Sequence, residues 1–508
     1  MSKFLKGTMI LIVAGLLTRI LGFINRIVVA RLIGEEGVGL YMMAVPTLVL
    51  AITITQFGLP VAISKLVAEA EAVGDRRKIK KKILVVSLSI TIVLSMIFFP
   101  ALLAIAPILS NTLFTDARVY YPLVAIAPVV PIVALSSVLR GYFQGRQQMK
   151  PYAYSQLLEQ AVRITLIAAF TTAFLPYGIE YAAAGAMVSA VVGEFVSLVY
   201  LFITFKRKKP IRIRYRFFAY VKEGKDTFVS LMRIAVPTLG SRMIGSVAWF
   251  FEPIVVAQSL ALAGITASHA TKQYGELTGY ALPLLMLPSF ITYALATSLV
   301  PAISEAAAQK QYRLIEYRLH QAVRLSLLAG GLSIVVLYVL AEEMMQLMYG
   351  ANEAAIFVKV MAPFFIFYYL QGPLQAVLQA LDLAKEAMTN SLIGAIVKTA
   401  LIFWLSSQPS LGIMGAALAI TVGIMVVTLL HAATIIKAIS LSLYVKHYVA
   451  HFIVIVSVTT VGHWIVPLLP FSLLMKTIVA IAIMTFIYLA LAQSFRLIEK
   501  DEFRQLFR

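Results

Sequence analysis

The sequence contains no cysteine and little charge of either sign. Because none of the 508 residues is cysteine, a disulfide framework, a thiolate nucleophile and a cysteine-ligated metal site are excluded. Charged residues make up 13% of the chain, whereas 61% is hydrophobic and the mean hydropathy is +0.90. A soluble domain carries about 25% charged residues. A chain this apolar could not cover a water-facing surface, which excludes a soluble enzyme, a disordered chain and a fibrous repeat.

Several catalytic motifs are also missing. Gly224-Lys225 has neither the upstream glycine nor the following Ser or Thr of a phosphate-binding loop. No H-E-x-x-H zinc motif and no D-x-D metal pair occurs. His447 and His451 stand four residues apart without an acidic partner nearby, so we interpret them as packing residues at the membrane interface. These absences argue against an ATP-driven pump with its own motor, a metalloprotease and a typical glycosyltransferase, and we expect no enzymatic activity.

Long apolar runs predict an all-α polytopic membrane protein. A crossing needs about 20 apolar residues. Arg19, Asn25 and Arg26 interrupt the first run and no A-x-A cleavage site follows it, so we interpret this run as a retained helix and not as a signal peptide. Fourteen transmembrane helices are expected, at 8–30, 40–66, 83–106, 119–140, 153–175, 181–205, 231–257, 277–300, 321–341, 355–380, 389–406, 411–436, 447–468 and 472–494.

The basic residues predict the orientation. The net charge is +20, which in a soluble protein suggests nucleic acid; here we interpret it as the charge of cytoplasmic loops, with no nucleic-acid partner. With the N-terminus inside, 30 basic residues fall in cytoplasmic segments, and only Arg31, Arg118 and Lys272 fall outside. The expected location is therefore the cytoplasmic membrane, with both termini in the cytoplasm.

An internal duplication divides the chain. Ile27–Ala30 recurs as Ile254–Ala257, and Ala127-Pro128 matches Ala362-Pro363 at an offset of 235 residues, at which Arg163 also faces Lys398. Two six-helix halves of the same orientation form a parallel repeat, related by an axis along the membrane normal. The expected organisation is an N-terminal lobe at 1–205, a basic cytoplasmic linker at 206–230, a C-terminal lobe at 231–437, and two extra helices with a cytoplasmic tail at 438–508.

Ionisable residues inside the spans are the candidate functional residues, because burying them in hydrocarbon is costly. Arg19 and Arg242 each lie about eleven residues into a helix, near the bilayer midplane, at comparable places in the two repeats. We interpret both as lining a cationic cavity for an anionic substrate; a structural ion pair is the alternative. Arg163 and Lys398 are weaker candidates for the same role.

Acidic and polar residues offer candidates for a gate or for ion coupling. The repeat places Glu252 opposite Asn25 and next to Arg26. An Arg26–Glu252 pair between the two halves would seal the outside of an inward-open state. Glu159 lies four residues before Arg163, on one helix face, where a self-compensating pair is the simpler interpretation. Glu194 is a candidate proton or cation site, which leaves H+ or Na+ coupling open; no other cofactor is expected.

Several stretches resemble a known family. The polysaccharide-exporter and lipid-flippase branch of the multidrug/oligosaccharidyl-lipid/polysaccharide superfamily is similar in its first helix and beyond. The resemblance is carried by Thr18–Arg26 (TRILGFINR), Ala30–Gly34 (ARLIG), Gly37–Tyr41 (GVGLY), Gly58–Lys65 (GLPVAISK) and Leu139–Gly145 (LRGYFQG). In the related lipid II flippases the first stretch reads Ser-Arg-x-Leu-Gly-Phe-x-Arg-Asp. Arg19 keeps the first arginine, whereas Asn25 and Arg26 replace the second arginine and the aspartate.

The resemblance implies two lobes around a central cavity, and alternating access by rocking of one lobe against the other. It implies a flippase for an anionic undecaprenyl-pyrophosphate-linked glycan, a peptidoglycan precursor for the spore cortex, in which Arg19, Arg242 and Arg26 contact the head group. Membrane lipid and cell-wall synthesis enzymes are the implied partners. A cation-coupled multidrug antiporter of the same superfamily and a non-transporting scaffold of a cell-wall complex are the alternatives.

Overall fold

The computed structural model describes residues 3–73, 76–207, 217–439 and 445–498, and within these ranges it contains helices and no strand. The predicted all-α membrane class is confirmed. Thirteen segments of the described ranges are long and apolar enough to cross a membrane. The first of them, Val13–Glu71, has 59 residues and so holds both of the first two predicted spans. The predicted number of fourteen is thus an approximate count of the same segments.

A glycine breaks the first long helix. Helix α1 (Lys3–Gln56) contains Gly34 at φ 64° and ψ −171°, which separates two helical parts. A left-handed φ is cheap only for glycine. A second break follows at Phe57 (φ 50°) and Gly58 (φ 67°), after which α2 begins. The first two membrane crossings are therefore joined at Gly34 with almost no connecting loop, and the second crossing bends at Phe57 and Gly58.

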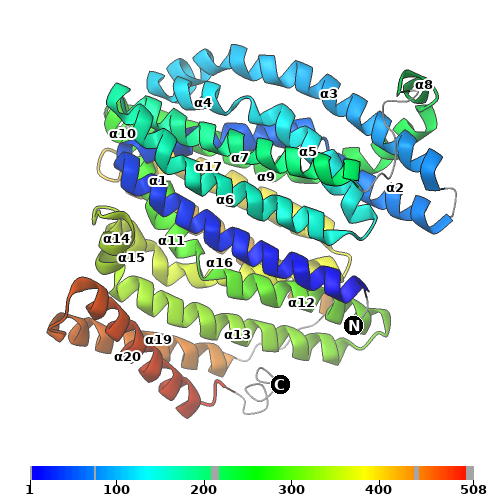
Figure 1. Cartoon of the computed structure of the whole chain (residues 1–508). Coiled ribbons are helices and arrows are strands. Elements are labelled where there is room, and N and C mark those ends of the chain that lie inside the picture. The colour runs from blue at the N-terminus through cyan, green and yellow to red at the C-terminus, as the bar shows by residue number, and fades with distance from the viewer. Residues whose placement is uncertain (1–2, 74–75, 208–216, 440–444, 499–508) are drawn as a thin grey trace. The chain divides into compact units, whose positions relative to one another are not determined.

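The first compact unit covers residues 1–275. Within it α1 packs along α6 and α7, and a buried apolar cluster joins α2, α3, α5, α7 and α9 around Ile63, Leu84 and Tyr142 (Figure 1). Its further helices are α2 (Leu59–Val73), α3 (Arg76–Ile108), η1 (Leu109–Leu113), η2 (Ala117–Val119), α4 (Tyr120–Ile126), α5 (Val129–Gly145), α6 (Met149–Phe174), η3 (Leu175–Tyr177), α7 (Ile179–Arg207), α8 (Phe217–Lys222), α9 (Lys225–Leu262) and α10 (Ala267–Gly275).

The second compact unit covers residues 276–508. It has one apolar cluster between α12, α13 and α16 and another between α13, α19 and α20 (Figure 1). Its helices are η4 (Glu276–Ala281), α11 (Leu282–Met286), α12 (Ser289–Ala308), α13 (Tyr312–Val339), α14 (Ala341–Tyr349), α15 (Ala355–Met361), η5 (Ala362–Phe364), α16 (Phe365–Ala380), α17 (Ala384–Ser406), α18 (Ile413–Ile439), α19 (Val445–Ile465), η6 (Val466–Leu468) and α20 (Leu473–Ser494).

The duplication read from the sequence recurs in the backbone. Both Ala-Pro pairs interrupt a helix: α4 ends at Ile126 and α5 begins at Val129, and likewise α15 ends at Met361 and α16 begins at Phe365. The next turn is also the same in both halves.

Left-handed residues mark this turn and the one before it at the same offset of 235. They are Gln147 (φ 55°) and Asp382 (φ 62°), and Thr115 (φ 60°) and Gly350 (φ 76°). Two different residue types adopt each left-handed conformation, so the shared fold imposes these turns.

The predicted lobe boundaries follow the repeat, whereas the compact units divide later, between residues 275 and 276. Helix α9, which begins the second repeat, packs against α1, α2 and α3 of the first unit. The lobes at 1–205 and 231–437 therefore stay a prediction. The linker at 206–230 lies partly outside the described residues, and its described part forms the end of α7, α8 and the start of α9.

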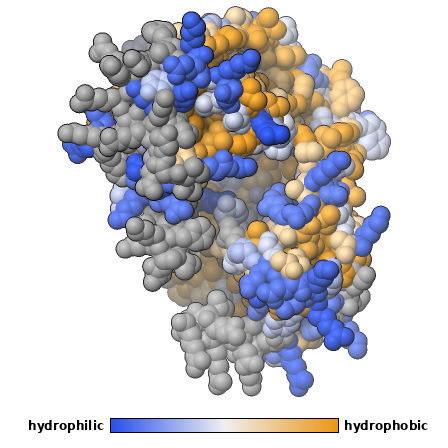
Figure 2. All heavy atoms as spheres, turned by 90° about the vertical axis from the view of Figure 1, so that its right-hand side faces the viewer, coloured by the Kyte–Doolittle hydropathy of each residue, from blue (hydrophilic) through white to orange (hydrophobic). Residues whose placement is uncertain are grey.

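One end of the first unit is rich in basic residues. Figure 2 shows hydrophilic side chains gathered on this side, where α2 ends and α3 begins. Lys82 forms an ion pair with Glu223 at 3.5 Å, and the Lys81 Nζ lies 4.7 Å from the ring centroid of Tyr220. Part of the predicted cytoplasmic charge is thus bound to the segment around α8.

Candidate functional site

The predicted cavity arginines of the first unit lie on α1 and α9. Arg19 and Arg26 are exposed on α1, and Arg242 is exposed on α9. Arg242 Nη1 donates a hydrogen bond to Gln56 Oε1 at 3.2 Å. Thr53 and Ser246, one turn away on each helix, share a hydroxyl contact of 2.9 Å. The two helices are therefore joined by polar side chains at the level of Arg242.

Two candidate gate residues on these helices are buried. Glu252 is 6% exposed on α9, and Asn25 is 4% exposed on α1. The side-chain oxygen of Asn25 has no hydrogen-bond partner among the residues that the structure describes. The exposed guanidinium of Arg26 and the buried carboxylate of Glu252 occupy different environments, and their pairing stays a hypothesis.

A buried three-residue ion cluster joins α5, α6 and α7. Arg140 Nη2 lies 3.3 Å from Glu159 Oε2 and 3.1 Å from Glu194 Oε1, and it donates to Ser197 Oγ at 3.0 Å. All three ionisable side chains are at most 16% exposed. In this part of the chain Glu159 pairs with Arg140 and not, as the spacing on one helix face suggested, with Arg163. The reason is that Arg140 of the neighbouring α5 reaches both carboxylates at once.

Sequence reasoning missed Arg140 because it assigned the residue to a cytoplasmic segment. Helix α5 continues to Gly145, five residues past the predicted end of the span at 140. Arg140 therefore lies inside the helix and faces α6 and α7. The apolar and aromatic residues on both sides of it, Leu139 and Tyr142-Phe143, were the available signal that the helix continues.

Arg163 and Lys398 occupy matched places in the two units. A Cβ added at Gly193 on α7 would lie 3.4 Å from the Arg163 Cβ, and one added at Gly423 on α18 would lie 2.8 Å from the Lys398 Cβ. In each unit a glycine on the next helix thus makes room for the aliphatic stem of the cation. This common packing favours a shared architectural role for the two stems, while their charged heads stay candidates for binding.

A second charged network lies in the first unit where α1, η2 and α10 meet, away from the basic end at which α2 ends and α3 begins. Arg118 forms ion pairs with Glu36 at 2.8 Å and with Asp116 at 2.9 Å, and Lys272 pairs with Glu35 at 3.0 Å. Two of the three basic residues predicted to lie outside the membrane are therefore held by carboxylates. We call Glu35, Glu36, Asp116, Arg118, Ser268, Thr271 and Lys272 the outer network.

Asp116 is the central acceptor of the outer network. It is 5% exposed and accepts hydrogen bonds from Arg118 and, at 2.7 Å, from the Thr271 hydroxyl. Burial alone would raise the pKa of Asp116, but the hydrogen bonds from Arg118 and Thr271 and the charge of Arg118 hold this pKa below its ordinary value. Gly39 and Gly275 let the backbones of α1 and α10 touch here. A Cβ at Gly39 would collide with the carbonyl oxygen of Thr271 on α10, and a Cβ at Gly275 would collide with that of Glu35 on α1. The adjacent acids Glu35-Glu36 were the sequence signal for this network.

Comparisons with known proteins show which family the chain resembles along its length. A profile described as polysaccharide biosynthesis protein matches residues 4–307. The chain belongs to this family. A second profile, MatE, matches residues 277–404. Stage V sporulation protein B of Bacillus subtilis (strain 168) is 62% identical over 507 residues, which cover 99% of this chain and 98% of that protein.

Two further relatives of this polysaccharide biosynthesis family member are flippases by name. Lipid II flippase MurJ of Bacillus subtilis (strain 168) is 26% identical over 79% of this chain and 77% of that protein. A solved structure of lipid II flippase MurJ in an inward closed conformation superposes with a TM-score of 0.68, at 14% identity, and covers 98% of this chain and 99% of that chain. The chain thus has the fold of this solved flippase, as the resemblance implied.

Proposed function

We propose that this family member is a flippase for an anionic lipid-linked glycan, and that it works by alternating access. The relatives support this proposal, since stage V sporulation protein B is 62% identical and lipid II flippase MurJ shares both sequence and fold. By analogy the substrate is a peptidoglycan precursor used in spore formation, and cell-wall synthesis enzymes supply and consume it. The chain itself acts as a transporter and not as an enzyme.

The distribution of charge on α1 and α9 carries the proposal. Arg19, Arg26 and Arg242 are exposed in the central parts of these helices, whereas the carboxylate of Glu252 is buried. An arginine facing hydrocarbon at this depth costs several kcal/mol, so a protein-lined aqueous path is its favourable environment. Guanidinium groups bind pyrophosphate oxygens in a two-pronged geometry. The accessible charge therefore suits an anionic head group while the lipid tail stays in the bilayer.

The carboxylates of the first unit are less available to a substrate. Arg140 neutralises part of the charge of Glu159 and Glu194. A multidrug antiporter captures cations with acidic residues in its cavity, so this arrangement disfavours it. The MatE match over residues 277–404 nevertheless makes such an antiporter the second candidate. Glu159, Glu194, Glu252 and Asn25 stay proposals for ion coupling or gating.

In the proposed cycle the outer network closes one side of the membrane. With the N-terminus in the cytoplasm, Glu35, Arg118 and Lys272 lie at the outer surface. Their ion pairs must separate before a head group can leave on that side. The orientation of both termini is part of this proposal and rests on the positive-inside distribution of charge.

Binding of purified protein to lipid II tests the proposal. Native mass spectrometry would compare the wild type with Arg19→Ala, Arg242→Ala and a control, Lys385→Gln, which removes an exposed cation at the start of α17. Each arginine variant should bind at least about tenfold more weakly, because a charge-assisted hydrogen bond contributes about 1.5–3 kcal/mol. The control should bind like the wild type.

Two results would contradict the proposal. If lipid II bound both arginine variants as tightly as the wild type, the substrate would not bind at Arg19 and Arg242 on α1 and α9. Binding of cationic drugs in preference to lipid II, with dependence on Glu159 or Glu194, would favour the antiporter instead. A flipping assay in proteoliposomes with fluorescent lipid II would then separate a transporter from a scaffold, since a scaffold binds without moving the head group.

A further inference from the structure

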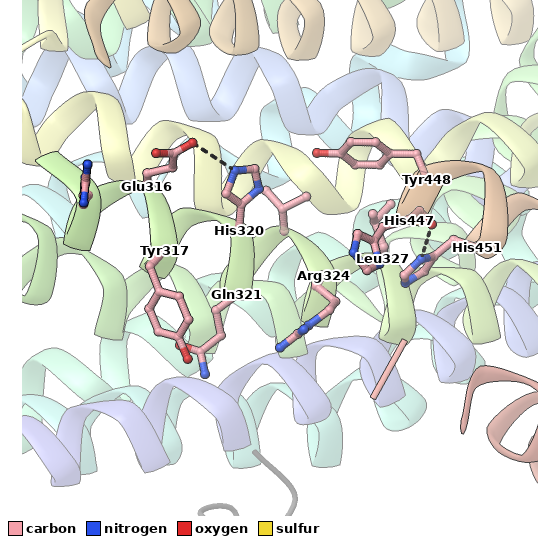
Figure 3. Close-up of a pocket in the computed structure, with 11 residues that line it drawn as sticks. Glu316, Tyr317, His320, Gln321, Arg324, Leu327, His447, Tyr448 and His451 are labelled. Atoms are coloured by element: carbon pink, nitrogen blue, oxygen red, sulfur yellow. Dashed lines mark hydrogen bonds and ion pairs between the residues drawn. The ribbon is translucent and has the colours of Figure 1, made fainter. Parts of the chain in front are cut away.

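A polar pocket lies between α13 and α19 in the second unit. Its volume is about 390 Å³. Arg313, His320 and Arg324 line it from α13, and His447 and His451 line it from α19, with Tyr317 and Tyr448 at its sides (Figure 3). We call it the α13–α19 pocket. It is unusual because five basic or imidazole side chains line it, from the N-terminal halves of two membrane helices.

His451 is the buried polar group of the pocket. It is 2% exposed, and its Nδ1 lies 2.9 Å from the backbone oxygen of His447. Since a carbonyl oxygen only accepts, Nδ1 carries the proton and donates. The opposite nitrogen, Nε2, is buried and has no hydrogen-bond partner among the described residues. A buried polar atom of this kind calls for a partner, and a ligand in the α13–α19 pocket would supply one.

The charge of the pocket is positive. Arg313 and Arg324 each contribute a full positive charge, and one carboxylate, Glu316, lines the same pocket. That carboxylate lies 3.7 Å from His320 Nε2 on its own helix (Figure 3). Two guanidinium groups beside imidazole rings favour a phosphate, whose oxygens accept several hydrogen bonds at once. When Nδ1 of an uncharged His451 ring donates to His447, Nε2 is an acceptor, which suits a ligand that also carries a hydroxyl group.

The surroundings point to a lipid as the source of that phosphate. Helix α19 continues from the pocket with large apolar side chains that are exposed: Val449 (50%), Phe452 (67%) and Val456 (45%). In a membrane these side chains face acyl chains. Tyr448, at the boundary, is of the type enriched where a membrane meets water. A polar pocket that opens onto an apolar helix face matches an amphipathic ligand better than a free ion.

We propose that the α13–α19 pocket binds the phosphate headgroup of an anionic phospholipid, with the acyl chains along Val449 and Phe452. Arg313 and Arg324 bind the phosphate, and His451 accepts a hydroxyl of the headgroup. The site is independent of the transported substrate, because its residues belong to α13 and α19 and none of the proposed head-group arginines lines it. Such a lipid would fasten α19 to α13 at the membrane surface.

Lipid binding to the detergent-purified full chain tests this proposal. The probe is short-chain phosphatidylglycerol, titrated in native mass spectrometry beside phosphatidylcholine of the same chain length and beside inorganic phosphate. The variants are Arg313→Gln, Arg324→Gln, the double variant and His451→Phe. Lys385→Gln is a control with the same charge change as each single arginine variant. Arg313 is exposed in the first turn of α13, so its replacement leaves folding intact.

We expect phosphatidylglycerol to bind the wild type and the control in preference to phosphatidylcholine. The double variant should bind it about tenfold or more weakly, with each single variant intermediate. Lipid II binding should be unchanged in the double variant, which separates this proposal from the proposed function. Equal binding of both phospholipids, binding unaffected by the double variant, or inorganic phosphate displacing the lipid at equal concentration would each overturn it.

Discussion

Removing Arg140 alone should destabilise the protein more than removing all the charge around it. One guanidinium nitrogen contacts a carboxylate oxygen of Glu159 at 3.3 Å and one of Glu194 at 3.1 Å. In Arg140→Met these two buried carboxylates lose the cation that they share. Loss of one partner from a buried ion pair costs about 3–5 kcal/mol. We therefore expect a destabilisation of about 3–5 kcal/mol.

The assay is thermal unfolding in detergent, followed by intrinsic tyrosine and tryptophan fluorescence. Glu159→Gln should be mild, because Arg140 keeps Glu194 as its partner. The matched control is the triple variant Arg140→Gln, Glu159→Gln and Glu194→Gln, which replaces the cluster with neutral residues that can hydrogen-bond one another. It should melt at a higher temperature than Arg140→Met although it differs from the wild type at more positions. If Arg140→Met melts at or above the triple variant, the electrostatic reasoning is refuted.

Three further predictions follow from particular contacts. Because the protein has no native cysteine, Ala270→Cys reports access to the buried side of α10. Adding Arg118→Gln should speed labelling of this cysteine by a membrane-impermeant maleimide about threefold to tenfold, because the ion pairs to Glu36 and Asp116 are lost. An unchanged labelling rate would exclude the outer network as a closure. Because the pKa of Asp116 is lowered, its contribution to folding stability is present above the unfolded-state pKa near 3.8 and is lost as pH falls through the folded-state pKa. The difference in melting temperature between wild type and Asp116→Asn should therefore shrink between pH 6 and pH 3. A difference that grows would show that folding raises the pKa of Asp116. Gly193→Ala should lower the melting temperature because its Cβ would lie 2.8 Å from the backbone oxygen of Glu159, whereas Gly240→Ala, with no atom within 4 Å, should leave it unchanged or raise it; equal responses would contradict the packing argument.

The sequence predicted the fold well because hydrophobic length and proline placement are local signals. Each predicted span overlaps a helix, and the Ala-Pro pairs at 127–128 and 362–363 interrupt helices in both halves. Gly34 lies between the predicted spans 8–30 and 40–66, whereas the break at Phe57 and Gly58 falls inside the span 40–66 and was not predicted.

The candidate site was predicted less well because its contacts join distant parts of the chain. Glu159 and Arg163 share a helix face, so their pairing was the simple expectation. The observed partner, Arg140, lies on another helix and depends on how α5 packs against α6 and α7. The hydrogen bond from Arg242 to Gln56 spans 186 residues of sequence. Periodicity within one helix cannot reveal such partners, because they are fixed by packing between helices.

The duplication shows which features occur in both halves of the chain and which occur only in the first half. Turns and helix breaks repeat at an offset of 235, as do the cations Arg163 and Lys398. At that offset Arg140 corresponds to Gln375 and Glu159 to Gly394, so the second half builds the same helices without this ion cluster. A buried ion cluster is also costly to form, since desolvation can exceed the attraction between the charges. The helices that the two halves share therefore do not depend on the cluster of Arg140, Glu159 and Glu194.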